Sequence, residues 1–158
     1  MSTIAAHHAF HATTSDWLSG DHTLARYHWP SPELPAKAQV LLVHGLGEHM
    51  GRYNHVAFAL QSAGYAVQGY DHVGHGLSSG ERGDVATPNQ LVEDLAAVVA
   101  DIQHHKPRTE PLVILGHSMG GLVVARALGQ QACTADAAVL SAPAFAAFTN
   151  AVQKLLLA

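Results

Sequence analysis

Short, uninterrupted apolar runs alternate along this chain with longer stretches whose apolar residues recur every three or four positions. Residues 40–43 read Val-Leu-Leu-Val, and similar runs lie at residues 112–115 and 137–140. Runs of this length without polar alternation are typical of strands that are buried on both faces. Because strands and helices alternate with short links between them, the pattern predicts an α/β domain with a mostly parallel sheet and flanking helices.

Further strands and helices are predicted from the turn residues and helix-ending glycines that separate apolar runs. Strands at residues 13–18 and 23–29 flank the turn signal Ser19-Gly20-Asp21, and another is expected at residues 65–70. Helices are expected where apolar residues recur at residues 53–63 and 122–128, and a glycine follows each of them.

The clearest helix lies before Pro107. Its apolar stripe consists of Leu91, Val92, Leu95, Val98, Val99 and Ile102. Thr87-Pro88-Asn89-Gln90 has the form of a capping box with proline at the first helical position. We therefore predict that this helix is capped at Thr87.

Composition excludes several classes of protein. The 158 residues are 48% hydrophobic and 13% charged, which is too apolar for a disordered chain. No run approaches the ~20 apolar residues of a membrane span. The net charge of −4, without a basic cluster, argues against nucleic acid as the main partner. The chain shows no secretory signal and a single cysteine, Cys133, so we expect a cytoplasmic protein without disulfides.

Neither the histidines nor the glycines indicate a cofactor. The histidine groups 7–11 and 104–105 lack carboxylate or cysteine partners at ligand spacing, so solvated histidines explain them better than a metal site. Gly45-x-Gly47 and Gly74-x-Gly76 each lack the third glycine of a dinucleotide-binding fingerprint. We expect no metal and no organic cofactor.

The segment Gly116-His117-Ser118-Met119-Gly120 has the pattern G-x-S-x-G, between a predicted buried strand and a predicted helix. A sharp turn there would hold Ser118 in a strained conformation and expose its hydroxyl as a nucleophile. The helix N-terminus, beginning with the Met119 amide, would direct positive charge at a developing oxyanion. The alternative is a glycine-rich turn with an incidental serine.

A second segment, the loop after the predicted strand at residues 40–43, complements the turn at Ser118. His44-Gly45-Leu46-Gly47 follows the strand at residues 40–43, where hydrolases with a nucleophile turn place an oxyanion-hole loop. The backbone N–H groups of Leu46 and Met119 are then the two expected oxyanion donors. A plain loop between a strand and a helix is the alternative explanation.

Three motifs in order resemble the monoacylglycerol lipases, which belong to the lysophospholipase-like, serine-aminopeptidase-type branch of the α/β-hydrolases. The motifs are residues 44–53 (HGLGEHMGRY), residues 71–78 (DHVGHGLS) and residues 116–121 (GHSMGG). The resemblance implies the α/β-hydrolase fold and ester hydrolysis through an acyl-enzyme on Ser118. Monoacylglycerols or lysophospholipids are the implied substrates, bound in an apolar pocket under a mobile lid.

The resemblance also implies a division of the chain. Residues 13–143 are expected to be the N-terminal part of the hydrolase domain, while the polar residues 1–12 by themselves predict a flexible tail. Residues 144–158 would begin the lid, whose apolar stripe is compatible either with packing on the protein's own core or with contact to lipid or a membrane surface. Oligomeric state is left open.

The expected catalytic triad is incomplete. In this fold the acid and the histidine follow the serine, yet no histidine and only one acid, Asp136, follow Ser118. Upstream histidines are poor substitutes: His117 adjoins the serine, His44 and His49 belong to the oxyanion loop, and His72 and His75 are expected on the active-site rim. Asp71 is interpreted as a loop anchor.

We therefore expect a chain that ends before the last strands of its fold and is inactive alone. Residues 137–140 would form an unprotected apolar sheet edge. Two other functions are left open: a non-catalytic fragment that binds lipid or a partner chain, and a peptidase of the same branch.

Overall fold

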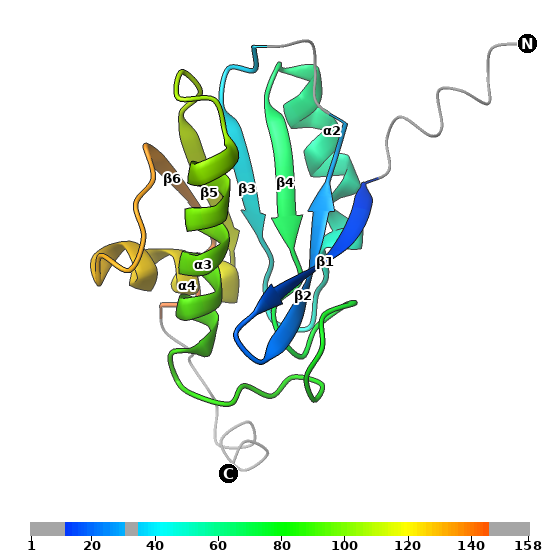
Figure 1. Ribbon diagram of the computed structural model, residues 1–158, viewed down its shortest axis with the longest axis vertical. Helices are drawn as coiled ribbons and strands as arrows, with labels where there is room; N and C mark the ends of the chain where they lie inside the picture. The colour runs from blue at the N-terminus through cyan, green and yellow to red at the C-terminus, as the bar shows by residue number, and fades with distance from the viewer. Residues whose placement is uncertain (1–11, 31–34, 146–158) are drawn as a thin grey trace, which may run out of the picture.

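The computed structural model describes residues 12–30 and 35–145. Within these residues, six strands form one sheet in the order β1-β2-β4-β3-β5-β6, with helices on both faces (Figure 1). The strands are β1 (Thr13–Ser19), β2 (His22–His28), β3 (Gln39–Val43), β4 (Ala66–Tyr70), β5 (Leu112–His117) and β6 (Ala137–Ser141). The helices are the short 3-10 helix η1 (Met50–Tyr53), α2 (Asn54–Ser62), α3 (Gln90–His105) and α4 (Met119–Gly129).

Strand β3 lies in the middle of the parallel part of the sheet. It pairs in parallel with β4 and β5, and β5 pairs in parallel with β6. The β1–β2 hairpin is antiparallel and joins the sheet through β4. The side chains of residues 40–43 are at most 3% exposed, which confirms a strand buried on both faces. The predicted mostly parallel α/β sheet is confirmed.

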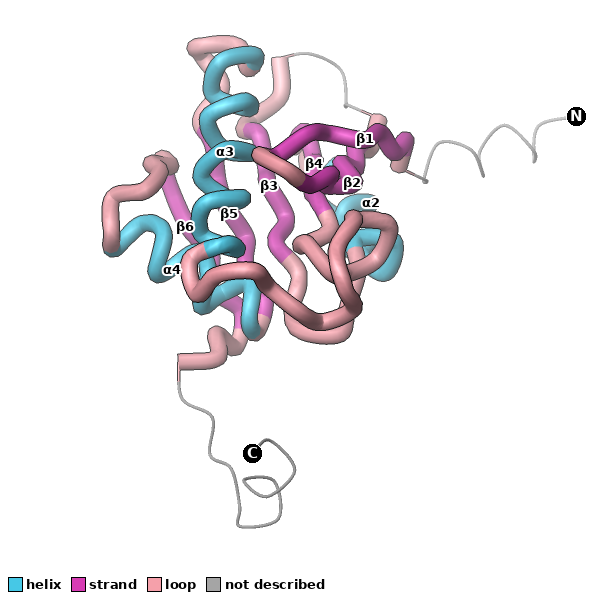
Figure 2. The backbone as a smooth tube through the Cα atoms, turned by 60° about the horizontal axis from the view of Figure 1, so that its bottom comes forward, coloured by secondary structure: helices cyan, strands magenta, loops and turns pink. Residues whose placement is uncertain are grey.

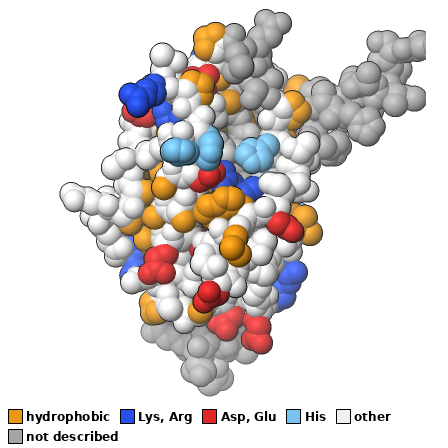
Figure 3. Space-filling view, viewed as in Figure 1, with side chains coloured by type: hydrophobic (Ala, Val, Ile, Leu, Met, Phe, Trp, Pro, Cys, Tyr) orange, Lys and Arg blue, Asp and Glu red, His pale blue; other side chains and the backbone are white. Residues whose placement is uncertain are grey.

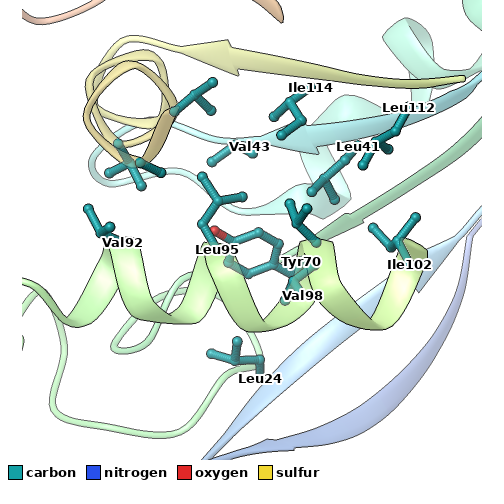
Figure 4. Packing of buried hydrophobic residues seen from close by; sticks show 14 of the residues in the cluster. Leu24, Leu41, Val43, Tyr70, Val92, Leu95, Val98, Ile102, Leu112 and Ile114 are labelled. Atoms are coloured by element: carbon teal, nitrogen blue, oxygen red, sulfur yellow. The ribbon is translucent and has the colours of Figure 1, made fainter. Parts of the chain in front are cut away.

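The two faces of the sheet have separate apolar cores. Helices α3 and α4 cover one face, and the predicted stripe of α3 is buried there against Leu41, Tyr70 and Ile114 (Figure 4). Helices η1 and α2 cover the other face, where Met50 and Ala57 are fully buried (Figure 2). Each large apolar side chain buried in these layers contributes roughly 1.5–3 kcal/mol to folding.

The ends of two helices differ from prediction. Helix α3 begins at Gln90 with Asn89 as its N-cap and no side-chain cap hydrogen bond, so the predicted capping box at Thr87 is wrong. The Gln90 side chain donates to Asp94 at 3.3 Å instead of reaching back to Thr87. Helix α4 ends at Gly129 as predicted, but the left-handed conformation after it is adopted by Gln131, with φ of 57°.

Strand β6 is the edge of the described sheet on the side of β5. Every residue of β6 is exposed, and Val139 and Leu140 retain 48% and 37% of their accessible surface. The predicted apolar edge is therefore present in the described part of the chain. Unpaired edge groups of this kind are templates for pairing with another strand.

Two predicted segments lie almost wholly outside the described residues: the tail at residues 1–12, apart from residue 12, and the lid at residues 144–158, apart from residues 144 and 145. Among the helices that the structure does describe, none is both long and apolar enough to cross a membrane.

Candidate active site

Ser118 lies between the end of β5 and the start of α4 with φ of 51° and ψ of −117°. This left-handed region favours glycine and costs another residue about 1–3 kcal/mol. Backbone hydrogen bonds maintain the conformation: the Ser118 N–H donates to the Ser141 carbonyl at 3.0 Å, and the Ser118 carbonyl accepts from Leu122 and Ala144, each at 3.1 Å. The predicted strained turn is confirmed.

Glycines let this turn approach the neighbouring strand. A Cβ at Gly116 would lie 2.6 Å from the Gly120 carbonyl oxygen. One at Gly120 would lie 2.5 Å from the His44 carbonyl oxygen and closer still to that of Val43. Side chains do not tolerate such contacts with rigid backbone, so the first turn of α4 packs directly against the end of β3.

The loop after β3 lies beside Ser118, as predicted. A Cβ added to Gly45 would be 3.1 Å from the Ser118 Cβ, and the adjoining Leu46 side chain is 67% exposed. Met119 is the first residue of α4, and the N–H groups of a first helical turn have no partner within the helix. The structure therefore brings together the two segments that carry the predicted oxyanion donors, Leu46 and Met119.

A carboxylate not singled out from the sequence holds this loop. Glu48 Oε2 accepts hydrogen bonds from the Gly45 N–H at 3.0 Å and from the Tyr53 hydroxyl at 2.8 Å. Burial alone would raise the pKa of Glu48, but these two hydrogen bonds, with nearby His117 and Arg52, bring that pKa below its ordinary value. The sequence feature that could have indicated this role is the position of Glu48, three residues after Gly45.

Removing one donor to Glu48 tests this contact. We expect Tyr53→Phe to lower the free energy of unfolding by about 1.5 kcal/mol, because a hydrogen bond to a charged group is lost. The pKa of Glu48 should rise at the same time, which side-chain NMR titration would detect. Tyr65→Phe is the matched control, since Tyr65 contacts Lys37 and no carboxylate among the described residues. Equal effects of the two variants would contradict the role given to Tyr53.

Three histidines gather beneath the same loop. The ring centroids of His44 and His72 are 4.5 Å apart, and those of His44 and His75 are 5.3 Å apart. His44 and His72 are completely buried and His75 is 7% exposed. His72 and His75 follow the end of β4, as predicted, and His75 lines a cavity together with Leu46. In the loop at residues 71–79 several backbone N–H groups have partners, among them the Asp71 carboxylate, which accepts from Leu77.

Asp71 anchors the loop at residues 71–79. Its carboxylate is buried and accepts from the Met50 N–H at 2.6 Å, the Leu77 N–H at 2.8 Å and the Tyr27 hydroxyl at 3.0 Å. These donors come from three separate segments of the chain. The interpretation of Asp71 as a loop anchor is therefore confirmed.

Acid should destabilise the protein through the buried histidines. Burial lowers the pKa of His44, and it lowers the pKa of His72 well below the ordinary value, with a further contribution from His44 and His75. Below about pH 6.5 the unfolded chain then binds more protons than the folded chain. The free energy of unfolding should fall there by about 1.4 kcal/mol per pH unit for each group, until its folded pKa is reached.

Urea unfolding of the native chain and of His72→Gln between pH 7 and pH 5 measures this dependence. The variant should show a shallower slope, by about 1.4 kcal/mol per pH unit. Parallel slopes would show that His72 is not buried in its neutral form.

The other histidines are placed differently. His117 has its Nδ1 atom 3.4 Å from the Ser141 hydroxyl, across the β5–β6 pair. Figure 3 shows histidine side chains at the surface of the face seen in Figure 1, and His104 and His105 on α3 are exposed, as expected of solvated side chains. Within the described ranges, no group of three or more histidine, cysteine or acidic side chains is arranged to hold a metal ion.

Two cavities adjoin the candidate site. One, of about 480 Å³, lies between the loop after β3 and the loop after β4 and is lined by Leu46, Glu48, His75 and Arg82 among others. The other, of about 140 Å³, lies beside Met119 and is bounded by Leu91 and Leu122. Leu46 therefore lines the first cavity and Met119 the second.

Comparison with known proteins gives consistent matches. A family model described as serine aminopeptidase, S33, matches residues 35–158. Monoacylglycerol lipase from Mycolicibacterium smegmatis is 40% identical over 114 residues, covering 72% of this chain and 40% of that protein. Monoglyceride lipase from Rattus norvegicus is 37% identical over 124 residues, covering 78% of this chain and 40% of that protein.

A solved structure agrees with these relatives. The monoacylglycerol lipase of Paleococcus ferrophilus superposes with a TM-score of 0.68 at 32% identity, over 84% of this chain and 49% of that one. The chain spans about 40% of the length of the curated relatives described above. The resemblance to monoacylglycerol lipases is confirmed. With an α/β-hydrolase sheet and a family match over most of its length, the chain belongs to the serine aminopeptidase, S33, family.

Proposed function

We propose that this protein is a serine hydrolase that cleaves carboxylic esters with a single long acyl chain, monoacylglycerols or lysophospholipids. The observation that carries the proposal is the strained Ser118, held beside the Gly45–Leu46 loop at the start of a helix. A serine in a glycine-favouring conformation at this position is typical of a nucleophile turn. Relatives named monoacylglycerol and monoglyceride lipase support the substrate class.

The proposed reaction proceeds through an acyl-enzyme. Ser118 Oγ bonds to the ester carbonyl carbon while its proton passes to a general base. The Leu46 and Met119 N–H groups donate to the oxyanion until the bond to the alcohol breaks, and the alcohol leaves with the proton. Water then attacks the acyl-enzyme and gives its proton to the base. The bond between the acyl carbon and Ser118 Oγ then breaks, the base returns the proton to Oγ, and the free acid is released.

We propose that the base and its acid come from polypeptide outside these 158 residues. Asp136, the one acid after Ser118, accepts the Leu112 N–H at 2.7 Å at the opposite end of β5. The His44 and His72 rings contact backbone groups and are completely buried. On this proposal the 158-residue chain alone has little or no turnover.

Exposed apolar side chains support a lipid substrate. Leu46, Leu77 and Phe145 are 67%, 68% and 61% exposed, and each follows the carboxyl end of a parallel strand, β3, β4 or β6. Those ends meet at one edge of a sheet, next to Ser118. We propose that this edge meets the acyl chain and contacts membrane lipid at its surface, and that residues 144–158 begin the lid over it.

A fluorophosphonate probe tests the nucleophile. Mass spectrometry should find the label on Ser118 in a longer polypeptide that continues past residue 158, and little label on the 158-residue chain. Hydrolysis of a monoacylglycerol, a lysophospholipid and an aminoacyl amide by the longer polypeptide then separates lipase from peptidase. Cleavage of the amide alone would refute the esterase proposal, and labelling elsewhere than Ser118 would refute the assigned nucleophile.

A second candidate function is binding without catalysis. The observation that favours it is the exposed β6 edge, whose outer backbone groups pair with no other strand within the described residues and are open to a partner strand. Efficient labelling of Ser118 in the 158-residue chain would exclude this candidate.

A further inference from the structure

The orientation of one peptide group decides whether Leu46 can donate to an oxyanion. In the planar trans peptide between Gly45 and Leu46, the Gly45 carbonyl and the Leu46 N–H point in opposite directions. The His44 ring holds that carbonyl, with Nδ1 at 2.7 Å from the Gly45 oxygen. Rotation of the peptide, which would turn the Leu46 N–H away, therefore has to break this hydrogen bond.

The partners of His44 determine which nitrogen carries its proton. A backbone carbonyl only accepts, so Nδ1, next to the Gly45 oxygen, must be protonated. On the other side, the His72 backbone N–H lies 3.0 Å from His44 Nε2 and only donates, so Nε2 must offer a lone pair. His44 is consequently neutral, with its proton on Nδ1.

His72 is fixed in the opposite tautomer. Its Nε2 lies 3.2 Å from the His44 carbonyl oxygen and must donate to it. The other nitrogen, Nδ1, is buried and has no hydrogen-bond partner among the described residues. Protonation of Nδ1 would leave a buried charged donor without a partner, which is costly. The two histidines thus bind each other's backbone and join the ends of β3 and β4.

We propose that His44 and His72 form a neutral, tautomer-locked pair that positions the Gly45–Leu46 peptide so that the Leu46 N–H faces the oxyanion. This inference rests on the proposed function. Both residues are positioning residues, because neither touches the reacting atoms. The pair acts with Glu48, which holds the preceding peptide through the Gly45 N–H.

The charged and titratable groups that face the pair leave this arrangement intact. Asp71 Oδ1 is 3.9 Å from His44 Nε2, beyond hydrogen-bond distance, and the Asp71 carboxylate already accepts three hydrogen bonds. The His75 ring faces both partners and bonds through Nδ1 to the Val73 carbonyl at 3.1 Å. A third such group, Glu48, is engaged by Gly45 and Tyr53.

Long-range ¹H–¹⁵N NMR of the imidazoles tests the tautomers directly in the 158-residue chain. At pH 6 we expect His44 to be neutral with Nδ1 protonated and His72 to be neutral with Nε2 protonated. A protonated ring at either position, or the reverse tautomer of His44, would overturn the proposal.

Two substitutions separate the functions of the His44 nitrogens. Asn places its amide near the Nδ1 position and can still donate to the Gly45 carbonyl, whereas Gln reaches the Nε2 position and cannot. We expect the Leu46 amide resonance to stay near its native position in His44→Asn and to shift in His44→Gln, with His104→Gln as the remote control. Equal shifts in both His44 variants would overturn the proposal.

The rate at which a fluorophosphonate probe labels Ser118 tests the positioning of the Gly45–Leu46 peptide separately from the proposed function. In a longer polypeptide that reacts with the fluorophosphonate probe, His44→Gln should slow labelling of Ser118 by about 10²-fold, as expected for loss of one oxyanion donor, and His44→Asn should recover most of that rate. An unlabelled Ser118 together with the expected tautomers would refute the proposed function and support the positioning of the peptide. Equal labelling rates in both variants would refute the positioning role.

Discussion

Ser118→Gly should raise the free energy of unfolding by about 1 kcal/mol and at the same time remove all reactivity at this site. The gain arises because glycine adopts φ of 51° and ψ of −117° without strain, whereas serine pays about 1–3 kcal/mol there. Part of that gain is cancelled, because glycine loses roughly 0.5–1 kcal/mol more conformational entropy on folding. Loss of a nucleophile lowers turnover by at least ~10³-fold.

Ser118→Ala is the matched control. Alanine also lacks the hydroxyl but keeps the Cβ, so its reactivity should vanish while the free energy of unfolding changes by less than about 0.5 kcal/mol. Urea unfolding of the three chains, with probe labelling of a longer polypeptide carrying each residue, measures both effects. If glycine and alanine gave the same stability, the backbone at residue 118 would not be strained.

Gly120→Ala should have the largest effect on stability, a loss of about 3 kcal/mol or more. The added Cβ would lie 2.5 Å from the His44 carbonyl oxygen and even closer to that of Val43. Both oxygens belong to the backbone of β3 and the loop after it, so no side-chain rotation relieves the contact. The start of α4 must then move away from β3, which is overpacking at a rigid junction.

Gly129→Ala provides the control within the same helix. A Cβ at Gly129 meets nothing within 4 Å, and this residue does not have a positive φ. Alanine there should stabilise the chain by roughly 0.5–1 kcal/mol through its helix propensity. Thermal unfolding of both variants, monitored by circular dichroism, compares them directly. Similar melting temperatures would show that α4 does not pack against β3 as described.

Elements with continuous or periodic apolar residues in the core were the most predictable part of the fold. The strands at residues 40–43 and 112–115 and the stripe of α3 are predictable because burial in a layered sheet demands continuous or periodic apolar residues. The Ser118 turn was predictable for another reason, since glycine spacing between a strand and a helix restricts the backbone locally. In each case the information lies within a few neighbouring residues.

Contacts between distant segments were not predictable in this way. The capping box at Thr87 failed because Gln90 bonds to Asp94, which also accepts from Ser19 and His22 of the β1–β2 hairpin. Nothing in the sequence around His72 indicates that its ring is completely buried or that its Nε2 atom bonds to the His44 carbonyl. A single polar residue carries no local sign of which distant group will satisfy its hydrogen bonds.

The central position of β3 determines when the candidate site can form during folding. Gln39 pairs with Ala66 on one side and with Leu112 on the other, so the loop carrying Leu46 and the turn carrying Ser118 meet only after a long stretch of chain has closed. Closure of such a loop has a large entropic cost and slows folding, whereas the β1–β2 hairpin can form locally. No partly folded chain with a free β3 holds both oxyanion donors together. Reactivity of Ser118 is therefore a late marker of folding, and its recovery after dilution from denaturant should coincide with burial of the β3 side chains.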